Sequence, residues 1–252
     1  AYTYATPTLS ATGMGIGEVT LTSQFNTASG NDMALTVATA RITSGSSTGV
    51  VPTYGMTASA TAGSAPAGSS MFIKINTTTI TTDDNHLGFF TPPATWTAAG
   101  NANLALAQPN PQAGDLMLAT IAIRPSASTV NTPSGWTLLD NQTGTDGAAE
   151  AADTGSVRLY TFYKVAAGSE GTATQTFTEN GTTSAWLGYI HKIRSTTGTY
   201  DLNSGGYSLN GDATNWNGTL DTDIGLTQGD LVMIIGAQNG DLSAASAWDI
   251  AA

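Results

Sequence analysis

Apolar and polar residues alternate with a period of two in several short stretches of the chain. In "SVRLYTFYKVA" (156–166), Leu159 and Val165 fall on one face. Arg158 and Lys164 fall on the other. Alternation of this kind between Gly, Asn or Asp residues predicts a half-buried β-strand. The same criteria predict strands at 18–25, 33–42, 71–80, 134–140, 172–178 and 185–194.

Two further stretches are apolar almost throughout. "LMLATIAIR" (116–124) predicts a central strand buried on both faces, and "LVMIIGAQ" (231–238) predicts another strand. Each follows Gly-Asp, at 114–115 and at 229–230. Glycine suits a turn position with positive φ, and the aspartate caps the turn. The similarity of the two segments indicates either a two-half pseudo-repeat within one sandwich or a chance similarity of buried strands.

The composition favours an all-β fold. The chain is rich in threonine, has 29 Gly and 9 Pro, and only 10% of its residues are charged. Threonine suits a pleated, half-wet surface, and the residues that favour exposed helices are scarce. No helical periodicity emerges. Short strands separated by turn residues predict an antiparallel β-sandwich or jelly roll.

Two segments break the strand pattern and suggest a division into two β domains. Residues 43–70 carry no charge and are rich in Ser, Gly and Ala, which predicts either a flexible surface loop or an arm ordered against a neighbouring subunit. The proline-rich segment 91–114 places a boundary near residue 100. We therefore expect an N-terminal domain over 1–100 and a sandwich domain over 101–252. The last residues, "SAWDIAA" (246–252), suggest that the sandwich domain is truncated at its C-terminal end.

Charge and cysteine content narrow the function classes. The net charge is −11, with 7 basic residues scattered singly, whereas a nucleic-acid footprint needs clustered Lys and Arg. No apolar run approaches the roughly 20 residues of a membrane span. The N-terminus has no signal-peptide pattern. The absence of cysteine excludes disulfides and thiol catalysis. We expect a virion exterior or, alternatively, an extracellular or bacterial cell-surface location.

Candidate metal ligands lie in two acidic segments. Asp83 and Asp84 begin "DDNHLGFF", and Asp221 and Asp223 end "DATNWNGTLDTD". Carboxylate oxygens are ligands for Ca²⁺, which is the possible cofactor here, although the same residues are also common in ordinary turns. His191 lies within a strand pattern, which favours a packed histidine over a catalytic base. No Gly-x-Ser-x-Gly elbow occurs, so no catalytic residues are predicted.

The tryptophans divide into two groups. Trp136, Trp186 and Trp248 fall in strand patterns and are predicted to be core residues. Trp96 and Trp216 fall in predicted loops, where an exposed indole could stack on a sugar ring. These two are the candidate glycan contacts.

The order of motifs over residues 110–252 resembles a β-sandwich module of bacteriophage tail and virion proteins and of bacterial surface proteins. The likeness rests on "AGDLMLATIAIRP", "TPSGWTLLD", "VRLYTFYKVAAGSEGTATQTFT" and "AWLGYIHKIR". The resemblance implies a structural sandwich and brings no catalytic residues with it. Residues 1–100 carry no such resemblance.

These observations predict a non-enzymatic structural protein of a phage-like virion, such as a decoration, cement, fibre or tail subunit. Its expected partners are copies of itself in a homo-oligomer and other virion proteins, bound through wide, nearly uncharged surfaces. The alternative is a secreted bacterial surface protein, either a filament or adhesin subunit or a carbohydrate-binding module.

Overall fold

The computed structural model describes residues 2–4, 8–10, 15–16, 20–26, 33–45, 53–60, 68–77, 87–90, 95–97, 103–124, 127–143, 157–180, 185–196, 199–209, 215–219 and 225–239. All regular elements in these ranges are β-strands, and all their pairings are antiparallel. The predicted all-β, antiparallel sandwich is thus confirmed. Jelly-roll connectivity stays a prediction. The described ranges contain no helix suited to crossing a membrane.

Two large sheets form the centre of the molecule. The first, called here the β11 sheet, has the order β13 (Thr137–Thr143), β14 (Arg158–Val165), β11 (Leu116–Arg124), β16 (Ala185–Ser195), β8 (Leu87–Phe90), with β9 (Thr95–Thr97) also paired to β16. The second, the β19 sheet, has the order β17 (Tyr200–Leu209), β7 (Gly68–Thr77), β19 (Leu231–Asn239), β5 (Met33–Ser44), β3 (Gly15–Ile16), with β4 (Thr20–Asn26) also paired to β5.

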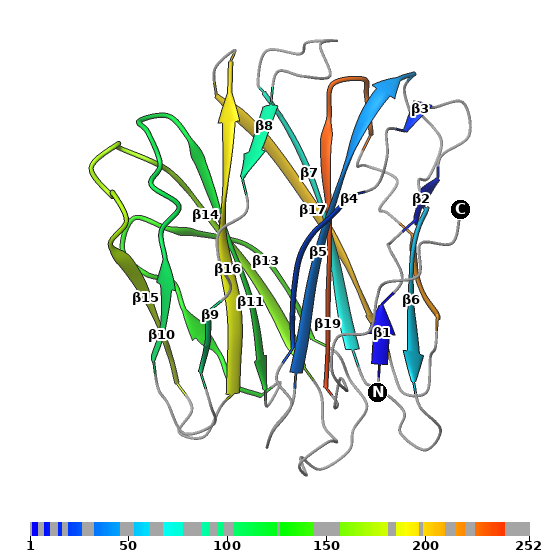
Figure 1. The fold of residues 1–252 in the computed structure, drawn as a ribbon, viewed down its shortest axis with the longest axis horizontal. Helices are drawn as coiled ribbons and strands as arrows, with labels where there is room; N and C mark the ends of the chain where they lie inside the picture. Colours follow the sequence, from blue (N-terminus) through cyan, green and yellow to red (C-terminus); the bar gives the residue numbers. More distant parts are fainter. Residues whose placement is uncertain are drawn as a thin grey trace.

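Smaller sheets cover the outer faces of this pair, so that the strands form successive layers (Figure 1). One contains β10 (Asn103–Ala107), β15 (Thr174–Glu179) and β12 (Val130–Asn131) and lies outside the β11 sheet. The other contains β1 (Tyr2–Tyr4), β6 (Thr53–Ala60) and β18 (Asn215–Thr219), with β2 (Thr8–Ser10) paired to β6, and lies outside the β19 sheet.

The layering explains why β11 is apolar along its whole length. Every residue of the strand is buried. Leu116 and Leu118 belong to the core between the two central sheets. Ile121 and Ile123 point the other way, into a second core that includes Phe177 of the outer strand β15. The prediction of a central strand buried on both faces is confirmed.

Aromatic side chains fill the second core. Trp136 meets Phe177 edge-on at a centroid distance of 5.6 Å, and its indole N–H donates to Gln175 at 3.0 Å. Phe162 lies 5.5 Å from Phe177. Trp186 is fully buried in the same cluster. The core positions predicted for Trp136 and Trp186 are therefore confirmed, while Trp248 lies outside the described residues.

Strands from the two parts of the chain are exchanged between the central sheets. Divided after β11, at the end of the first half of the pseudo-repeat, the chain has a first part of residues 1–124 and a second part of residues 125–252. β8 and β11 of the first part pair with β14 and β16 of the second part. In return β17 and β19 pair with β5 and β7 of the first part. Each central sheet contains strands from both sides of residue 100, and the division into two β domains stays a prediction. The proline-rich segment contains β9 and β10.

Part of the predicted loop or arm at 43–70 is also strand. β6 occupies Thr53–Ala60 and pairs with β1, β2 and β18. Its sequence, TYGMTASA, has small and polar residues and no clear apolar alternation. Because strand formation here depends on backbone pairing with three distant segments, a local pattern does not reveal it.

The exchange predicts that neither part of the chain folds alone. Fragments 1–124 and 125–252 should each remain unfolded, whereas co-expression should give a stable complex, because each central sheet needs strands from both. Co-purification through a tag on one fragment, followed by circular dichroism, tests this. Cooperative unfolding of either isolated fragment would contradict the exchanged arrangement.

Candidate functional site

The turn that leads into β11 is held by its backbone and by one carboxylate. Gly114 has φ of 87° and donates its N–H to Ala166 O at 2.9 Å. The N–H of Asp115 donates to Gln112 O at 3.1 Å, and Asp115 Oδ2 accepts the N–H of Gln112 at 2.7 Å. Positive φ suits glycine, and the aspartate closes the turn as its sequence position predicted.

The turn that leads into β19 repeats these contacts. Gly229 has φ of 95° and donates its N–H to Ile42 O at 2.9 Å. Asp230 N–H donates to Thr227 O at 3.1 Å, and Asp230 Oδ2 accepts the N–H of Thr227 at 2.7 Å. The strands beyond the turns correspond as well, since β11 lies between β14 and β16 and β19 lies between β5 and β7. This agreement supports the pseudo-repeat over chance similarity.

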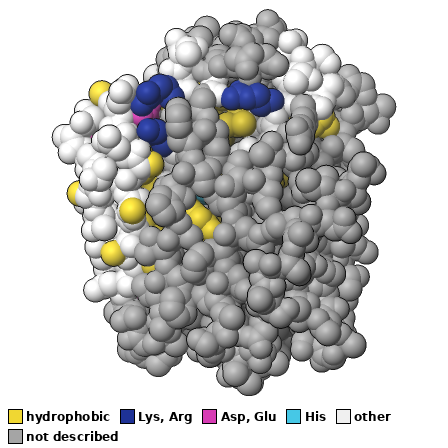
Figure 2. Space-filling view, in the orientation of Figure 1, with side chains coloured by type: hydrophobic (Ala, Val, Ile, Leu, Met, Phe, Trp, Pro, Cys, Tyr) yellow, Lys and Arg dark blue, Asp and Glu magenta, His cyan; other side chains and the backbone are white. Residues whose placement is uncertain are grey.

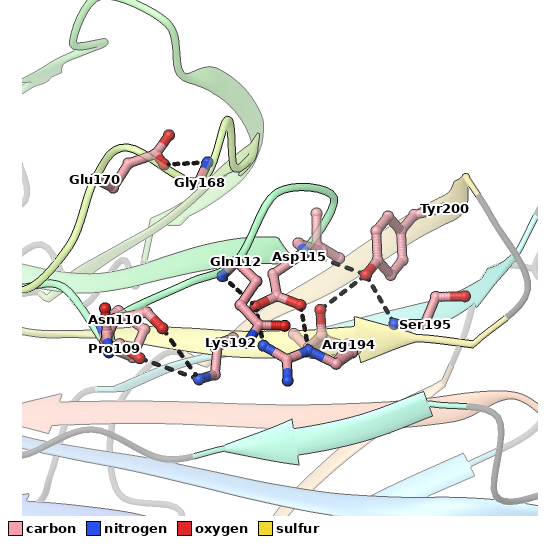
Figure 3. A network of polar contacts seen from close by, with 12 residues as sticks. Pro109, Asn110, Gln112, Asp115, Gly168, Glu170, Lys192, Arg194, Ser195 and Tyr200 are labelled. Atoms are coloured by element: carbon pink, nitrogen blue, oxygen red, sulfur yellow. Dashed lines mark hydrogen bonds and ion pairs between the residues drawn. The ribbon is translucent and has the colours of Figure 1, made fainter.

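The two aspartates differ in the side chain that they receive from the neighbouring strand. Arg194 donates from Nε to Asp115 Oδ1 and from Nη2 to Oδ2, both at 2.7 Å (Figure 3). At the equivalent position of the other half, Asn76 donates its Nδ2–H to Asp230 Oδ1. The first turn is thus closed by a bidentate ion pair and the second by a neutral amide.

This difference sets the two carboxyl groups apart electrostatically. Burial alone would raise the pKa of Asp115, but the hydrogen bonds from Arg194 and Gln112 and the charges of Arg194 and Lys192 lower it below the ordinary 3.8. Asp230 is fully buried, and its burial raises its pKa above 3.8 despite the hydrogen bonds that it accepts. Asp115 therefore gains from being ionised and Asp230 does not.

Tyr200 joins the two central sheets at the same place. It belongs to β17 of the β19 sheet, and its hydroxyl donates to Ile193 O at 2.8 Å. The same oxygen accepts the N–H groups of Ser195 at 3.0 Å and Leu116 at 3.2 Å (Figure 3). One phenol thus ties the start of β11 and the end of β16 to the opposite sheet.

Nearby polar side chains hold further turns. Lys192 donates to the carbonyl oxygens of Pro109 and Asn110 at 3.1 and 3.4 Å (Figure 3). Glu170 accepts the N–H groups of Ala167 and Gly168 and pairs with Lys164 at 2.9 Å. Although burial opposes ionisation, these donors lower the pKa of Glu170 to about 2.

A cavity of about 710 Å³ adjoins this network, between the central sheets. Leu116, Leu139, Val165 and Leu202 contribute to its apolar lining, and Arg194 and Thr199 are also among the lining residues. Pockets that hold small organic ligands commonly enclose roughly 300–1,000 Å³. The network and the cavity together are the candidate site.

The residues that the sequence nominated lie elsewhere. Asp83, Asp84, Asp221 and Asp223 fall outside the described residues, so the Ca²⁺ hypothesis stays a prediction. The backbones of Trp96 and Trp216 lie in β9 and β18 rather than in loops, and the structure does not describe their side chains. In the part of the chain that is described, no three His, Asp or Glu side chains gather as a metal site would require.

His191 is a packed core residue, as its strand pattern indicated. It is fully buried, and its Nε2 lies 3.2 Å from Thr120 Oγ1. The ring stacks on Tyr189 with a centroid distance of 5.6 Å. Burial lowers its pKa to about 3, so the imidazole is neutral near pH 7.

Sequence reasoning identified Asp115 as a turn residue but missed Arg194, Tyr200 and the cavity. A cation at the penultimate position of a strand, such as Arg194 in β16, is an ordinary surface feature until the strand pairing is known. The register that sets Leu116 opposite Ile193 brings the following residue, Arg194, next to Asp115.

No family model matches this chain, and no curated protein or solved structure matches it either.

Asp115→Asn and Asp230→Asn should have different effects. At neutral pH we expect Asp115→Asn to lower the free energy of unfolding by about 1.5–3 kcal/mol, since the charged hydrogen bonds to Arg194 are lost. Asp230→Asn should cost less, because it replaces a carboxylate whose ionisation burial disfavours. Urea unfolding of both variants and the wild type measures this.

The two variants should also respond to acid in opposite directions. Asp115 has a depressed pKa in the folded state, so its contribution is present above about pH 4 and is lost as the pH falls through the folded value. The Asp115→Asn defect should therefore shrink in acid. Asp230 has a raised pKa, so the wild type gains stability relative to Asp230→Asn as its carboxylate is protonated. Parallel pH profiles for the two variants would contradict this assignment.

Proposed function

We propose that the protein is a non-enzymatic structural protein of a phage-like virion exterior, such as a decoration, cement, fibre or tail subunit. In this role it acts through contacts between subunits and changes no substrate. The observation that carries the proposal is the exchange of strands between the two halves, since each half completes a central sheet of the other. The motif order that resembles virion and bacterial surface modules agrees with it.

The exchange suits a subunit that bears load. Separating the halves would break the hydrogen bonds that hold β11 between β14 and β16 and β19 between β5 and β7. Long-range antiparallel pairing of this kind resists local opening, because no half can detach without disrupting both sheets. Slow unfolding is a property that an exposed particle subunit requires.

The polar groups of the candidate site also fit a scaffold. Asp115 and Arg194 bond to each other, and the Tyr200 hydroxyl bonds to the backbone of Leu116 and Ser195, which fixes β11, β16 and β17 together. Asp230 does the same for the start of β19. In these contacts the polar side chains fix the backbone at the strand ends, which is a structural role.

The surface offers a place for subunit contacts. β13 is the last strand of the β11 sheet on its side, and its Leu138 is 39% exposed. Few charges occur along the chain, so wide neutral areas can meet a symmetric neighbour without a large desolvation cost. We assign the β13 edge to a contact between copies of the chain.

Self-association is the test. Size-exclusion chromatography with light scattering, followed by negative-stain electron microscopy, should show a defined homo-oligomer or a regular assembly. Leu138→Asp should weaken association by at least about tenfold, because an apolar side chain in an interface contributes roughly 1.5–3 kcal/mol. Thr176→Asp, which introduces the same charge at an exposed position of β15 away from the β13 edge, is the control and should associate as the wild type does.

Two outcomes would overturn the proposal. One is a chain that stays monomeric at all concentrations and associates with no particle. The other is selective binding on a glycan array that Trp216→Ala abolishes, which would favour the bacterial surface alternative with a carbohydrate ligand.

A further inference from the structure

The cavity opens between the two central sheets, at one end of their strands. From the β11 sheet it is lined by Leu116, Leu139 and Val165, where β11 and β13 begin and β14 ends. From the β19 sheet it is lined by Leu202 of β17. Leu116 belongs to the core between the sheets, and Leu139 and Leu202 pack against that core. The apolar lining of the cavity therefore continues the core toward the solvent.

The charged residues at this place project away from the cavity. Side chains alternate along a strand, and Leu116 and Ile193 face the core between the sheets. Their neighbours Asp115 and Arg194 therefore lie on the outer face of the β11 sheet, where Met117 belongs to the second core. Among the described residues of the lining, only Asp115 and Arg194 are charged. The inner walls that these residues form thus present no charged side chain.

Charge is scarce in the rest of the chain as well. Only 10% of the residues are charged, and on the face shown in Figure 2 the described basic side chains gather in two groups near the upper margin. The polar residues that line the cavity include the uncharged Ser195 and Thr199. A charged ligand would lose its hydration here without gaining a partner of opposite charge, whereas an apolar ligand would not.

The first half of the pseudo-repeat shows how the same place can be filled. Leu116 pairs with Val165 of β14, and its counterpart Leu231 pairs with Arg41 of β5, so Val165 and Arg41 occupy equivalent positions. The Arg41 side chain crosses from the β19 sheet to the β11 sheet, where its Nη2 donates to Leu87 O at the start of β8.

In the second half this bridge is missing. Leu87 pairs with Ser195, as Tyr200 pairs with Thr77, so Tyr200 is the counterpart of Leu87. The side chain of Val165 is too short to span the roughly 10 Å between packed sheets, and both Val165 and Tyr200 line the cavity. Val165 is 52% exposed, the larger value of the two exposed large apolar residues in the described part of the chain. Because the first half closes this place with a long side chain, the fold does not require it to stay open.

We propose that the cavity binds a small uncharged apolar molecule, which lies against Leu116, Leu139 and Leu202 and covers Val165. A volume of about 710 Å³ accommodates a small organic molecule. Binding removes the exposed apolar surface of these side chains from water, which is its driving force. This site does not depend on the proposed virion role.

A matched pair of fluorescent probes tests the site and its preference for uncharged ligands. N-phenylnaphthylamine is uncharged, and anilinonaphthalenesulfonate has the same aromatic groups with a sulfonate added. Titration of the full chain with N-phenylnaphthylamine should show saturable binding. The sulfonate should bind at least about tenfold more weakly, because the walls provide no cation to offset its loss of hydration.

Val165→Arg is the variant that closes the site. It introduces the residue found at the equivalent position of the first half, so its side chain should cross toward β17 and occupy the cavity. Binding of N-phenylnaphthylamine should weaken by at least about tenfold. Thr176→Arg, which adds the same charge at an exposed position of β15 in the outer sheet, is the matched control and should bind as the wild type does.

The proposal is overturned by absent or non-saturable binding of N-phenylnaphthylamine, by unchanged binding in Val165→Arg, or by sulfonate binding as tight as that of the uncharged probe. Circular dichroism establishes that each variant is folded. Should Val165→Arg fail to fold, Val165→Gln places a long uncharged side chain in the same space and carries the same expectation.

Discussion

β11 is hydrogen-bonded on one side to β14 and on the other to β16, and its side chains are buried on both faces. Both partners come later in the chain, so both neighbours of β11 belong to the second half. β19 stands in the same relation to β5 and β7 of the first half. Each half supplies the central strand of the other, and the two cores that flank the β11 sheet depend on this insertion. Because the contacts span long sequence separations, slow and highly cooperative folding is expected.

The pseudo-repeat has kept its backbone and changed its side chains. The Gly-Asp turns before β11 and β19 share their hydrogen bonds, while the groups around them differ. Arg194 stands where the other half has Asn76, and Val165 stands where it has Arg41. One half thus has an ion pair beside an open cavity, and the other has a neutral hydrogen bond beside an arginine that bridges the sheets. Both halves keep the Gly-Asp turn, whereas the side chains around the turn differ between them.

The structural role and the cavity make different demands on the molecule. A particle subunit depends on the exchanged strands and on an outer edge such as β13, whereas ligand binding depends on a few side chains at one end of the sheets. Tyr200 serves both, because it joins the sheets through its hydroxyl and lines the cavity.

The sequence by itself determined where the main strands lie and which side chains are buried. Residues 116–124 form β11 with the predicted bounds, and the strands predicted at 33–42, 185–194 and 231–238 agree with β5, β16 and β19 to within two residues. Alternating and continuous apolar residues predict burial from the local sequence alone. The turn role of Asp115 was readable for the same reason.

Only the tertiary structure decided which strands pair. β6 and β17 lack a clear apolar pattern and exist through the backbone hydrogen bonds of distant partners. The exchange of strands between the halves, the pair of Asp115 with Arg194, and the cavity at Val165 all depend on register, which no short stretch of sequence encodes. The apolar or polar character of each residue indicates whether it is buried. The pairing of strands depends on the whole chain, because a strand edge offers the same hydrogen-bond donors and acceptors to every other strand.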